Sequence, residues 1–247
     1  MYNNQGLSVS VCMATYNGRA FIEAQLDSIL PQLTEQDELV VSDNSSTDGT
    51  WELLESYQKK DQRIQLFKNE RPGVIGNFEY AISKGQNDLI FLSDQDDVWQ
   101  LNKVSVMKKY FQTHPDITVI VSDLIIVDND FQTLIPSYQA LRHTKPGFWH
   151  NLLRSSYIGA GMAFRRELKD LILPIPSDVP MHDMWIGLLA DHTKGVMFIP
   201  DQLVYYRRHG LNTTEIKTSA SKVQQFQWRW KAWRLVGKRL SENKKNP

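Results

Sequence analysis

The apolar positions of the chain follow two periods that alternate over its first 130 residues. Short, mostly apolar runs such as LSVSVCMA, ELVV and LIFL have the length of buried strands, and between them apolar residues recur every three or four positions, as in a helix. The pattern predicts strands within residues 7–18, 37–43, 63–70, 88–94 and 116–128, and helices within 20–33, 50–60, 76–85 and 101–114. Strands that alternate with helices predict a mostly parallel, doubly wound α/β sheet.

The ends of two helices and the second half of the chain add detail. Ser46 or Thr47 is expected to cap the helix over 50–60, and Gly85 to end the helix over 76–85. The later elements are a strand running into a helix over 157–173, a proline-rich loop over 174–180, a helix over 182–192, a strand pair within 195–210 and a helix from Ser219 onward. We therefore expect one domain over residues 1–216 and a helical segment over 217–247.

The composition narrows the classes of function. Basic and acidic residues both number 28 among 247, so the formal net charge is zero, whereas nucleic-acid-binding proteins are normally basic. Cys12 is the only cysteine, which excludes an intrachain disulfide and fits a reducing cytoplasm; its apolar surroundings predict a buried residue and not a nucleophile. We expect neither a secretory signal nor a membrane-spanning helix, because no apolar run is long enough.

Three carboxylates follow the apolar run DLIFL within four positions. Asp94, Asp96 and Asp97 in SDQDDVW repel one another, and burial without partners is costly, so the cluster needs a cation, hydrogen-bond donors or open solvent. Ligands of doubly wound sheets bind beyond the carboxyl ends of the strands, where Asp43 is also expected. Oxygen ligands there suit Mg²⁺ or Mn²⁺, although an isolated D-x-D sequence is more often a solvated turn.

Four motifs in a fixed order give the chain a resemblance to a known family. ATYNG after the first strand, VVSDNSSTDGT after the second, SDQDDVW after the fourth and the later HDMW are similar to those of inverting glycosyltransferases of family 2, which have the GT-A fold. The chain most resembles the bacterial members that build O-antigen and capsule repeat units. The resemblance implies a nucleotide-sugar-binding, Rossmann-like half over residues 1–130, an acceptor-side half over 131–216, and a basic C-terminal helix.

The resemblance assigns several side chains to the nucleotide. Thr15 and Tyr16 would line the nucleobase pocket, and Asp43 would accept a hydrogen bond from a base N–H, which suits uracil or thymine. Asp43 also suits an Asx-turn after its strand, and the two roles are compatible. Asn77 would lie near the nucleotide at a helix start, where Gly76 allows close approach of the backbone.

The acidic turn would hold the ribose and the metal. The resemblance implies that Asp94 binds the ribose hydroxyls, that Asp96 ligates the metal bridging the two phosphates, and that Asp97 supports the site from behind. His209, in YYRRHGLN, resembles the late histidine that completes the metal shell in many GT-A enzymes. A mixed carboxylate and imidazole set favours Mn²⁺ over Mg²⁺.

The HDMW motif would supply the catalytic base. Asp183 would remove the proton of the acceptor hydroxyl as its oxygen attacks the anomeric carbon. Many family members carry Glu-Asp here, whereas this chain has His182, whose role stays open between acceptor contact, tuning of the base and packing. Trp185 would form a wall for an acceptor sugar, the alternative being a core residue of its helix.

The segment over 217–247 is basic and rich in tryptophan. Its lysines and arginines stand among one phenylalanine and three tryptophans, and Glu242 is the only acid after Glu215. Two interpretations stay open: a helix that lies on an anionic membrane surface, or a helix that packs on the domain with a solvated basic face. A lipid-linked acceptor would favour the membrane.

These inferences combine into a hypothesis about function. We expect a metal-dependent inverting hexosyltransferase that moves one sugar from UDP-glucose, UDP-galactose or UDP-N-acetylglucosamine to a saccharide on undecaprenyl diphosphate, in O-antigen or capsule biosynthesis. It would act in the cytoplasm, at the inner face of a bacterial cytoplasmic membrane. A dTDP-rhamnose-dependent enzyme, a nucleotidyltransferase and a binding module without turnover remain alternatives, although ATYNGRA lacks the Gly-rich basic phosphate loop usual in nucleotidyltransferases.

Overall fold

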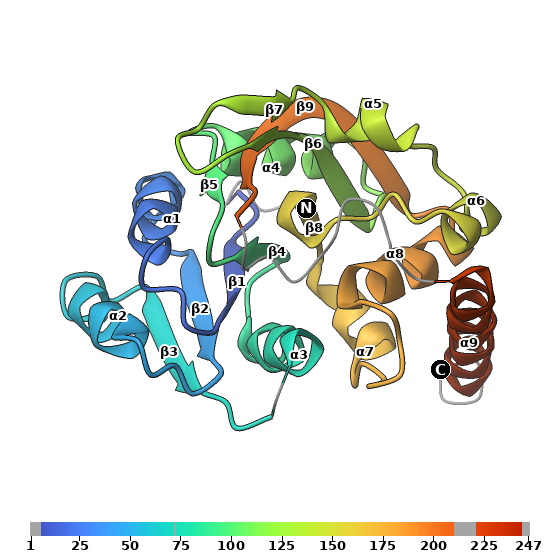
Figure 1. Cartoon of the computed structure of the whole chain (residues 1–247), viewed down its shortest axis with the longest axis horizontal. Helices are drawn as coiled ribbons and strands as arrows, with labels where there is room; N and C mark the ends of the chain where they lie inside the picture. The colour runs from blue at the N-terminus through green and yellow to red at the C-terminus, as the bar shows by residue number, and fades with distance from the viewer. Residues whose placement is uncertain (1–5, 72, 210–220, 244–247) are drawn as a thin grey trace.

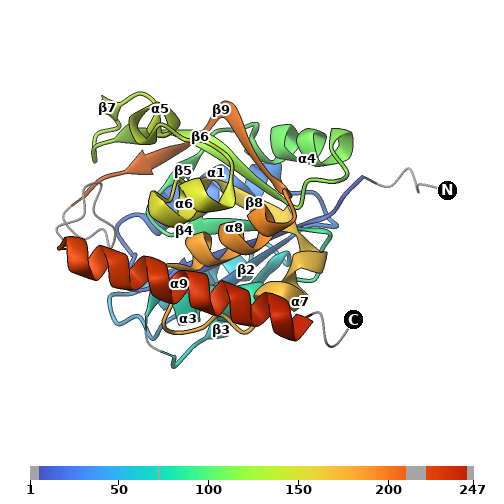
Figure 2. The same ribbon diagram turned by 90° about the vertical axis from the view of Figure 1, so that its right-hand side faces the viewer.

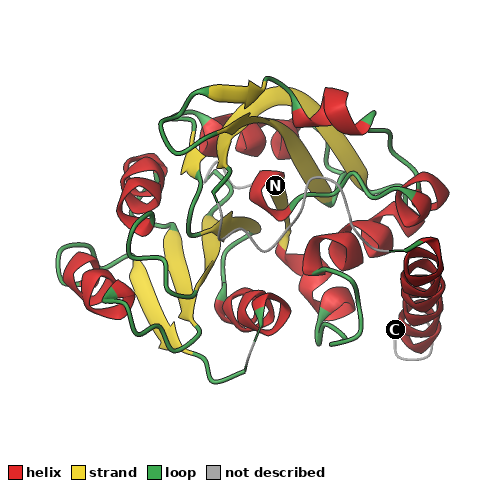
Figure 3. Cartoon of the chain, in the orientation of Figure 1, coloured by secondary structure: helices red, strands yellow, loops and turns green. Residues whose placement is uncertain are grey.

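A curved sheet of nine strands runs through the molecule, and helices cover both of its faces (Figure 1). The structure is a computed structural model that describes residues 6–71, 73–209 and 221–243. The predicted helix start at Ser219 and the boundary between residues 216 and 217 lie outside these residues. Figure 3 separates the strands from the helices that flank them.

Four parallel strands form the first half of the sheet, in the order β3-β2-β1-β4. They are β1 (Val9–Thr15), β2 (Glu38–Asp43), β3 (Ile64–Lys68) and β4 (Leu89–Asp94). The helices beside them are α1 (Ile22–Ile29) with its extension η1 (Leu30–Gln32), α2 (Thr50–Gln58), α3 (Val74–Lys84) and α4 (Lys103–Thr113). The predicted alternation is confirmed over this half, and Gly85 ends α3 as predicted.

The start of α2 differs from the prediction. Gly49 precedes the helix with a φ of 91°, which glycine adopts without strain, and no side chain caps the helix. Ser46 instead donates to Asp43, and the N–H of Thr47 donates to Asn17. The predicted cap at Ser46 or Thr47 is wrong because the loop uses both residues to tie the ends of β1 and β2 together.

Five further strands complete the sheet: β5 (Val98–Trp99), β6 (Val119–Val127), β7 (Thr133–Ile135), β8 (Met162–Arg165) and β9 (Val196–Arg207). β8 lies antiparallel between β4 and β6, so it joins the two halves of the chain in one sheet. β9 is a single strand where a pair was predicted. Its register with β6 shifts between Ile199 and Gln202, which skips Pro200; proline has no N–H to donate, so the strand bends there and does not reverse.

Most helices of the second half cover the sheet on the side of α3, whereas Tyr138 and Leu141 of the first of them pack on the opposite side. They are α5 (Tyr138–Arg142), α6 (Phe148–Leu153), η2 (Gly159–Gly161), η3 (Arg166–Leu168), α7 (Lys169–Ile172), α8 (His182–His192) and α9 (Lys222–Asn243). α9 contacts α6, α7 and α8, and Figure 2 shows it lying across the front of the molecule. Within the described ranges, no helix combines the length and the apolar character needed to cross a bilayer.

The sheet separates two hydrophobic clusters. Phe78 and Trp185 belong to the cluster beneath α3, α8 and α9, and Phe91 and Trp99 belong to the cluster beneath α1 and α4. Cys12 is fully buried in the first cluster, as predicted, and burial raises the pKa of its thiol. This thiol is therefore protonated and packed, which is the state of a structural cysteine.

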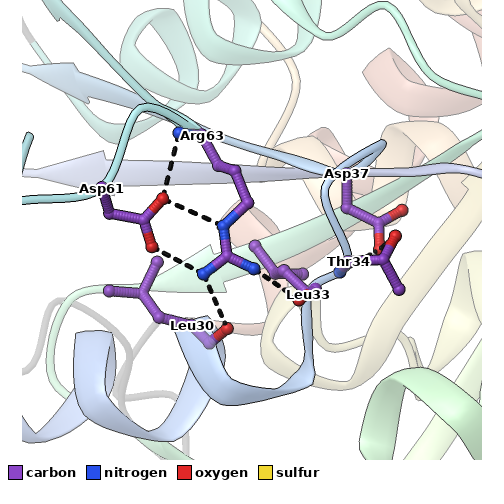
Figure 4. A network of polar contacts seen from close by, with 6 residues as sticks. All are labelled: Leu30, Leu33, Thr34, Asp37, Asp61 and Arg63. Atoms are coloured by element: carbon purple, nitrogen blue, oxygen red, sulfur yellow. Dashed lines mark hydrogen bonds and ion pairs between the residues drawn. The ribbon is translucent and has the colours of Figure 1, made fainter.

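Arg63 anchors the turn between α1 and β2, at the edge of the sheet opposite the carboxyl ends of β1 and β4 (Figure 4). Its guanidinium donates to the carbonyls of Leu30 and Leu33 and pairs with Asp61 at 2.6 Å. Asp37 closes the same turn and accepts a hydrogen bond from the first residue of β1. The amino edge of the sheet is thereby fixed, and the opposite edge is left to bind ligands.

Candidate active site

A cavity of about 1170 Å³ opens beyond the carboxyl ends of β1 and β4. It is lined from both halves of the chain, by Thr15, Tyr16, Asn77, Asp94, Asp96, Tyr138, Arg142, Tyr157, His182, Asp183 and His209 among others. The predicted site residues that do not line it are Asp43, Asp97 and Trp185. The fold therefore brings most of the predicted residues to one cavity, although they are spread over nearly 200 positions of sequence.

At one end of the cavity, Thr15 and Tyr16 form the wall predicted for the nucleobase. The hydroxyl of Thr15 donates to Asp43 Oδ1 at 2.8 Å, and Asn77 Nδ2 donates to the Thr15 carbonyl at 2.9 Å. Asp43 is 1% exposed and also accepts hydrogen bonds from Ser46, so it stands behind the wall. Its Asx-turn is thus present, while its predicted contact with a base stays a prediction.

Gln95 joins this wall to the acidic turn. Its side chain accepts a hydrogen bond from the Tyr16 N–H at 2.8 Å and donates to the Tyr16 carbonyl at 2.9 Å. A Cβ at Gly18 would lie 2.3 Å from Gln95 Oε1, so only glycine leaves room for this pairing. Sequence reasoning missed Gln95, because a glutamine between two aspartates carries no signal of a long-range contact.

The acidic turn places its three carboxylates differently. Asp94 and Asp96 face the cavity, whereas Asp97 is buried behind them and accepts a hydrogen bond from the Arg207 N–H at 3.2 Å. Its second oxygen has no hydrogen-bond partner among the described residues. Burial and the charge of Asp96 raise the pKa of Asp94 to about 7 and raise the pKa of Asp97 as well. Both carboxyl groups thus hold a proton more readily than a carboxyl in water does.

His209 approaches the turn from the end of β9. Its Nε2 lies 2.7 Å from Asp96 Oδ2, and its ring stacks on Phe21 with centroids 4.3 Å apart. The stacked ring holds the imidazole in place beside the carboxylate. Phe21 was expected only as an apolar residue of the helix pattern over 20–33, so its position beneath His209 is information that the structure adds.

The donor set beside Asp96 fits a divalent cation. Asp96 and His209 supply one carboxylate and one imidazole, a pair suited to Mn²⁺ or Mg²⁺. In the described part of the chain, no three histidine, cysteine, aspartate or glutamate side chains converge as a preformed metal site. Such a cation would therefore take its remaining ligands from substrate phosphates and water.

A buried lysine lies behind the acidic turn. Lys103, the first residue of α4, is fully buried, and its Nζ donates to the Ala160 carbonyl at 2.6 Å and lies 3.9 Å from the centre of the Trp99 ring. Burial lowers the pKa of this ammonium to about 7, against the opposing effect of Asp97 and Asp94. Lys103 thus links the acidic turn to η2, and its position seven residues after Asp96 gave no signal in the sequence.

Asp183 lies in the first turn of α8 and faces the cavity. Its Oδ2 accepts a hydrogen bond from the Gly159 N–H at 3.0 Å, and its Oδ1 accepts one from the Met184 N–H at 2.5 Å. Burial raises the pKa of Asp183 to about 6, which the two backbone hydrogen bonds oppose. The carboxylate is therefore oriented, and it is able to take a proton near neutral pH.

The two neighbours of Asp183 in the HDMW motif have different surroundings. His182 is buried, stacks on Phe78 at 4.0 Å and lines the cavity, with neither ring nitrogen hydrogen-bonded among the described residues. Burial lowers its pKa to about 3, so the imidazole is neutral. Trp185 is 2% exposed and donates to the Ile172 carbonyl, so the predicted acceptor wall at Trp185 is wrong: its ring points into the core.

The second half of the chain lines the cavity with residues that sequence reasoning did not single out. Arg142 donates through Nη2 to the Ser155 carbonyl at 2.7 Å, and its Nε has no partner in the described chain. Tyr157 donates to the buried Asp191. Both lie in or next to the irregular stretch after residue 130, where the apolar pattern has no clear period and names no individual residue.

The fold and the cavity together define a protein that binds its ligand beyond the carboxyl edge of an α/β sheet, with an acidic turn at the centre. The profile of the family described as Glycosyl transferase family 2 matches residues 10–172. The chain belongs to this family, as predicted, and its fold is the predicted GT-A fold.

Individual relatives agree with this assignment. The chain is 24% identical over 229 residues to an uncharacterized glycosyltransferase of Nostoc sp., covering 89% of this chain and 70% of that protein. Over 106 residues it is 33% identical to the Escherichia coli enzyme WfaP, named UDP-Glc:alpha-D-GlcNAc-diphosphoundecaprenol beta-1,3-glucosyltransferase, with 42% of this chain and 41% of WfaP covered. The segment similar to WfaP thus spans less than half of either protein.

Solved structures share the fold. TarS 1–349 of S. aureus in complex with UDP superposes with a TM-score of 0.70 at 18% identity, over 94% of this chain and 65% of that one. The mannosyltransferase PcManGT of Pyrobaculum calidifontis, in complex with GDP-Man and Mn²⁺, superposes with a TM-score of 0.63 at 19% identity, over 99% of this chain and 66% of that one. The chain therefore spans about two thirds of the length of these neighbours.

Proposed function

We propose that the protein is a metal-dependent inverting hexosyltransferase that moves one sugar from a UDP-sugar to a saccharide carried on undecaprenyl diphosphate. The observation that supports it most is the meeting of Asp96, His209 and Asp183 at one cavity that also holds the predicted nucleobase wall. The reaction class is that of the family to which the chain belongs. The proposed setting is O-antigen or capsule biosynthesis at the inner face of the bacterial cytoplasmic membrane.

Asp183 serves as the base in this proposal. Its carboxylate, held by the Gly159 and Met184 N–H groups, takes the proton of the acceptor hydroxyl while that oxygen attacks the anomeric carbon. The bond from the anomeric carbon to the diphosphate breaks on the opposite face, so the configuration inverts. An α-linked UDP-hexose then gives a β-glycoside.

The acidic turn would hold the cation that offsets the negative charge of the donor's diphosphate. Asp96 and His209 would hold Mn²⁺ or Mg²⁺, which when bound offsets the charge that develops on the leaving diphosphate. Asp94, facing the cavity, accepts hydrogen bonds from the ribose hydroxyls. Asp97 stays behind the turn and orients it through the Arg207 backbone.

The donor and acceptor are proposed partly from a relative. WfaP is named as transferring glucose from UDP-Glc to GlcNAc on diphosphoundecaprenol, and the similar segment covers 42% of this chain. UDP-glucose is thus the first donor to test, with UDP-galactose and UDP-N-acetylglucosamine next. A dTDP-rhamnose donor remains the second candidate, since thymine and uracil present the same N–H to the pocket.

Calorimetric titration tests the donor and metal assignments together. UDP and dTDP are titrated into the wild-type protein and into Asp96→Ala, with and without Mn²⁺. We expect Mn²⁺-dependent binding of UDP that is lost in Asp96→Ala. Binding of dTDP but not of UDP would favour dTDP-rhamnose as the donor. Binding of neither nucleotide would overturn the proposed function.

A further inference from the structure

Exposed apolar side chains gather on two neighbouring helices. Eleven large hydrophobic residues of the described chain are exposed, and seven of them lie on α6 and α9, which contact each other. We call this set without Trp228, which helical spacing places on the opposite side of α9, the α6–α9 face; its members are Trp149, Leu153, Val223, Phe226, Trp230 and Trp233. A cluster of exposed apolar residues of this kind marks a surface that binds a membrane or another protein.

α9 has two apolar sides, and only one of them packs on the domain. Ala232 and Val236 are buried against the hydrophobic cluster that also contains α8. Arg239 secures the same side by donating to the carbonyls that end α7, at 2.6–2.9 Å. A helix that is already docked through one side does not need a second apolar side for its own folding.

The other side of α9 carries apolar residues at helical spacing. Val223, Phe226, Trp230 and Trp233 follow one another at intervals of three and four positions, so they form one stripe, and they are 48–67% exposed. Of the two interpretations that the sequence left open, packing on the domain accounts for the buried side only. The exposed stripe requires a separate explanation.

Positive charge accompanies the stripe. The sequence of α9 contains six lysines and arginines and one acid, Glu242, although the net charge of the whole chain is zero. The Arg234 guanidinium lies 5.1 Å from the centre of the Trp230 ring, and Lys238 continues the same side one turn later. Tryptophan next to arginine and lysine matches the boundary between the acyl chains and the headgroups of an anionic bilayer.

The face also borders the acceptor side of the cavity. Leu153 at the end of α6 is two residues from Ser155, which lines the cavity. On the other flank, Lys231 of α9 pairs with Asp178 at 2.9 Å, and the loop after Asp178 leads through Pro180 to Asp183. Figure 2 shows α6 and α9 on one side of the molecule.

We infer that the α6–α9 face docks on an anionic lipid bilayer and presents the acceptor side of the cavity to the membrane. The docking itself rests on the exposed stripe and its charge. Its purpose, delivery of a lipid-linked acceptor to Asp183, rests on the proposed function. A protein partner of opposite charge or a second copy of this chain would cover the same residues, and the test distinguishes them.

Co-sedimentation of the full chain with vesicles tests the docking. Vesicles of phosphatidylglycerol and phosphatidylcholine are compared with vesicles of phosphatidylcholine alone, and we expect at least about tenfold stronger partitioning onto the anionic vesicles. Trp230→Ala/Trp233→Ala and Arg234→Gln/Lys238→Gln should each lower partitioning about tenfold or more. Leu101→Ala, which removes an exposed leucine outside the face, is the matched control and should partition like the wild type.

Several outcomes would overturn the inference. They are equal partitioning onto both kinds of vesicle, wild-type partitioning by both double variants, and concentration-dependent dimerisation that Trp230→Ala/Trp233→Ala abolishes without vesicles. UDP titration of the same variants reports whether they are folded, because the substituted residues lie outside the cavity. Vesicle binding without UDP binding by the wild type would reject the proposed function and support the docking. UDP binding without vesicle binding would reject the docking and support the proposed function.

Discussion

Burial acts in opposite directions on two adjacent residues at the start of α8. It raises the pKa of Asp183 to about 6, because the charged carboxylate is disfavoured, and lowers that of His182 to about 3, because the charged imidazole is disfavoured. Near pH 7, Asp183 is therefore ionised and His182 is neutral. The ionised Asp183 can therefore accept a proton, and the neutral His182 places no positive charge beside it.

The first prediction concerns the pH dependence of transfer. Since only ionised Asp183 can accept a proton, kcat/KM should fall about tenfold per pH unit below pH 6 and level off above it. Asp183→Asn should lower kcat by about 10²–10⁴-fold and leave UDP binding unchanged. Rates measured from pH 5 to about pH 8, with UDP titration as the control, check this; a flat profile would remove Asp183 from the role of base.

The same pKa has a consequence for stability. The pKa of Asp183 is about 3.8 in the unfolded chain and about 6 in the fold, so its favourable contribution to stability is present below pH 3.8 and is lost as the pH rises through 6. Asp183→Asn should therefore be at least as stable as the wild type at pH 7, by up to about 2–4 °C in Tm. A large loss of Tm would show that the two backbone hydrogen bonds outweigh the burial of charge.

The second prediction concerns Lys103. Lys103→Met leaves the buried Ala160 carbonyl without its donor, which should cost about 1–3 kcal/mol of unfolding free energy. Because Ala160 lies in η2, next to the Gly159 N–H that holds Asp183, kcat should fall more than KM rises. Urea unfolding and steady-state kinetics measure both effects. Lys109→Met, on the exposed side of α4, is the control and should change stability by less than about 0.5 kcal/mol.

At the scale of elements, α8 connects the cavity to the core through a close approach at Gly187. A Cβ on Gly187 would lie 2.5 Å from the ring of Tyr157, whose hydroxyl donates to Asp191. The absence of a side chain at this position therefore lets Tyr157 pack against α8 and line the cavity.

The third prediction follows from this contact. Gly187→Ala should push Tyr157 from its place and lower the unfolding free energy by about 1–3 kcal/mol, because a well-packed ring cannot move without strain. The KM for the acceptor should rise more than the dissociation constant of UDP, since Tyr157 lies on the acceptor side. Gly237→Ala on α9, where a Cβ would meet nothing within 4 Å, is the matched control and should be neutral or slightly stabilising.

At the scale of the whole molecule, the predicted helices and strands match the structure wherever the apolar residues recur with one clear spacing, that of a strand or that of a helix. The alternating strands and helices up to α4 were predictable because each apolar run has the length of one element, and SDQDDVW marked the functional edge of the sheet. β9 was predicted as two strands, yet pairing with β6 continues past Pro200 through a register shift. Trp185 was misplaced because helical spacing alone does not say which side of α8 meets the core.

The residues that sequence reasoning missed share one property. Gln95, Lys103 and Phe21 act through partners far along the chain, namely Tyr16, Ala160 and His209. Such contacts depend on how the strands are ordered in the sheet, which local patterns do not encode. Aspartates that face the cavity at strand ends can be predicted from the sequence, whereas the residues that position them are identified only once the fold is known.

The double hydrogen bond between Gln95 and the Tyr16 backbone ties the proposed nucleobase wall to the acidic turn. Ordering one of them by its ligand therefore orders the other, and by thermodynamic linkage each ligand raises the affinity of the other by the same factor. Gln95→Ala should reduce this factor about fivefold, measured as the ratio of UDP dissociation constants without and with Mn²⁺. In kinetic terms, the proposed donor would then enter as its metal complex, and the free nucleotide-sugar would be a poor competitor for the site.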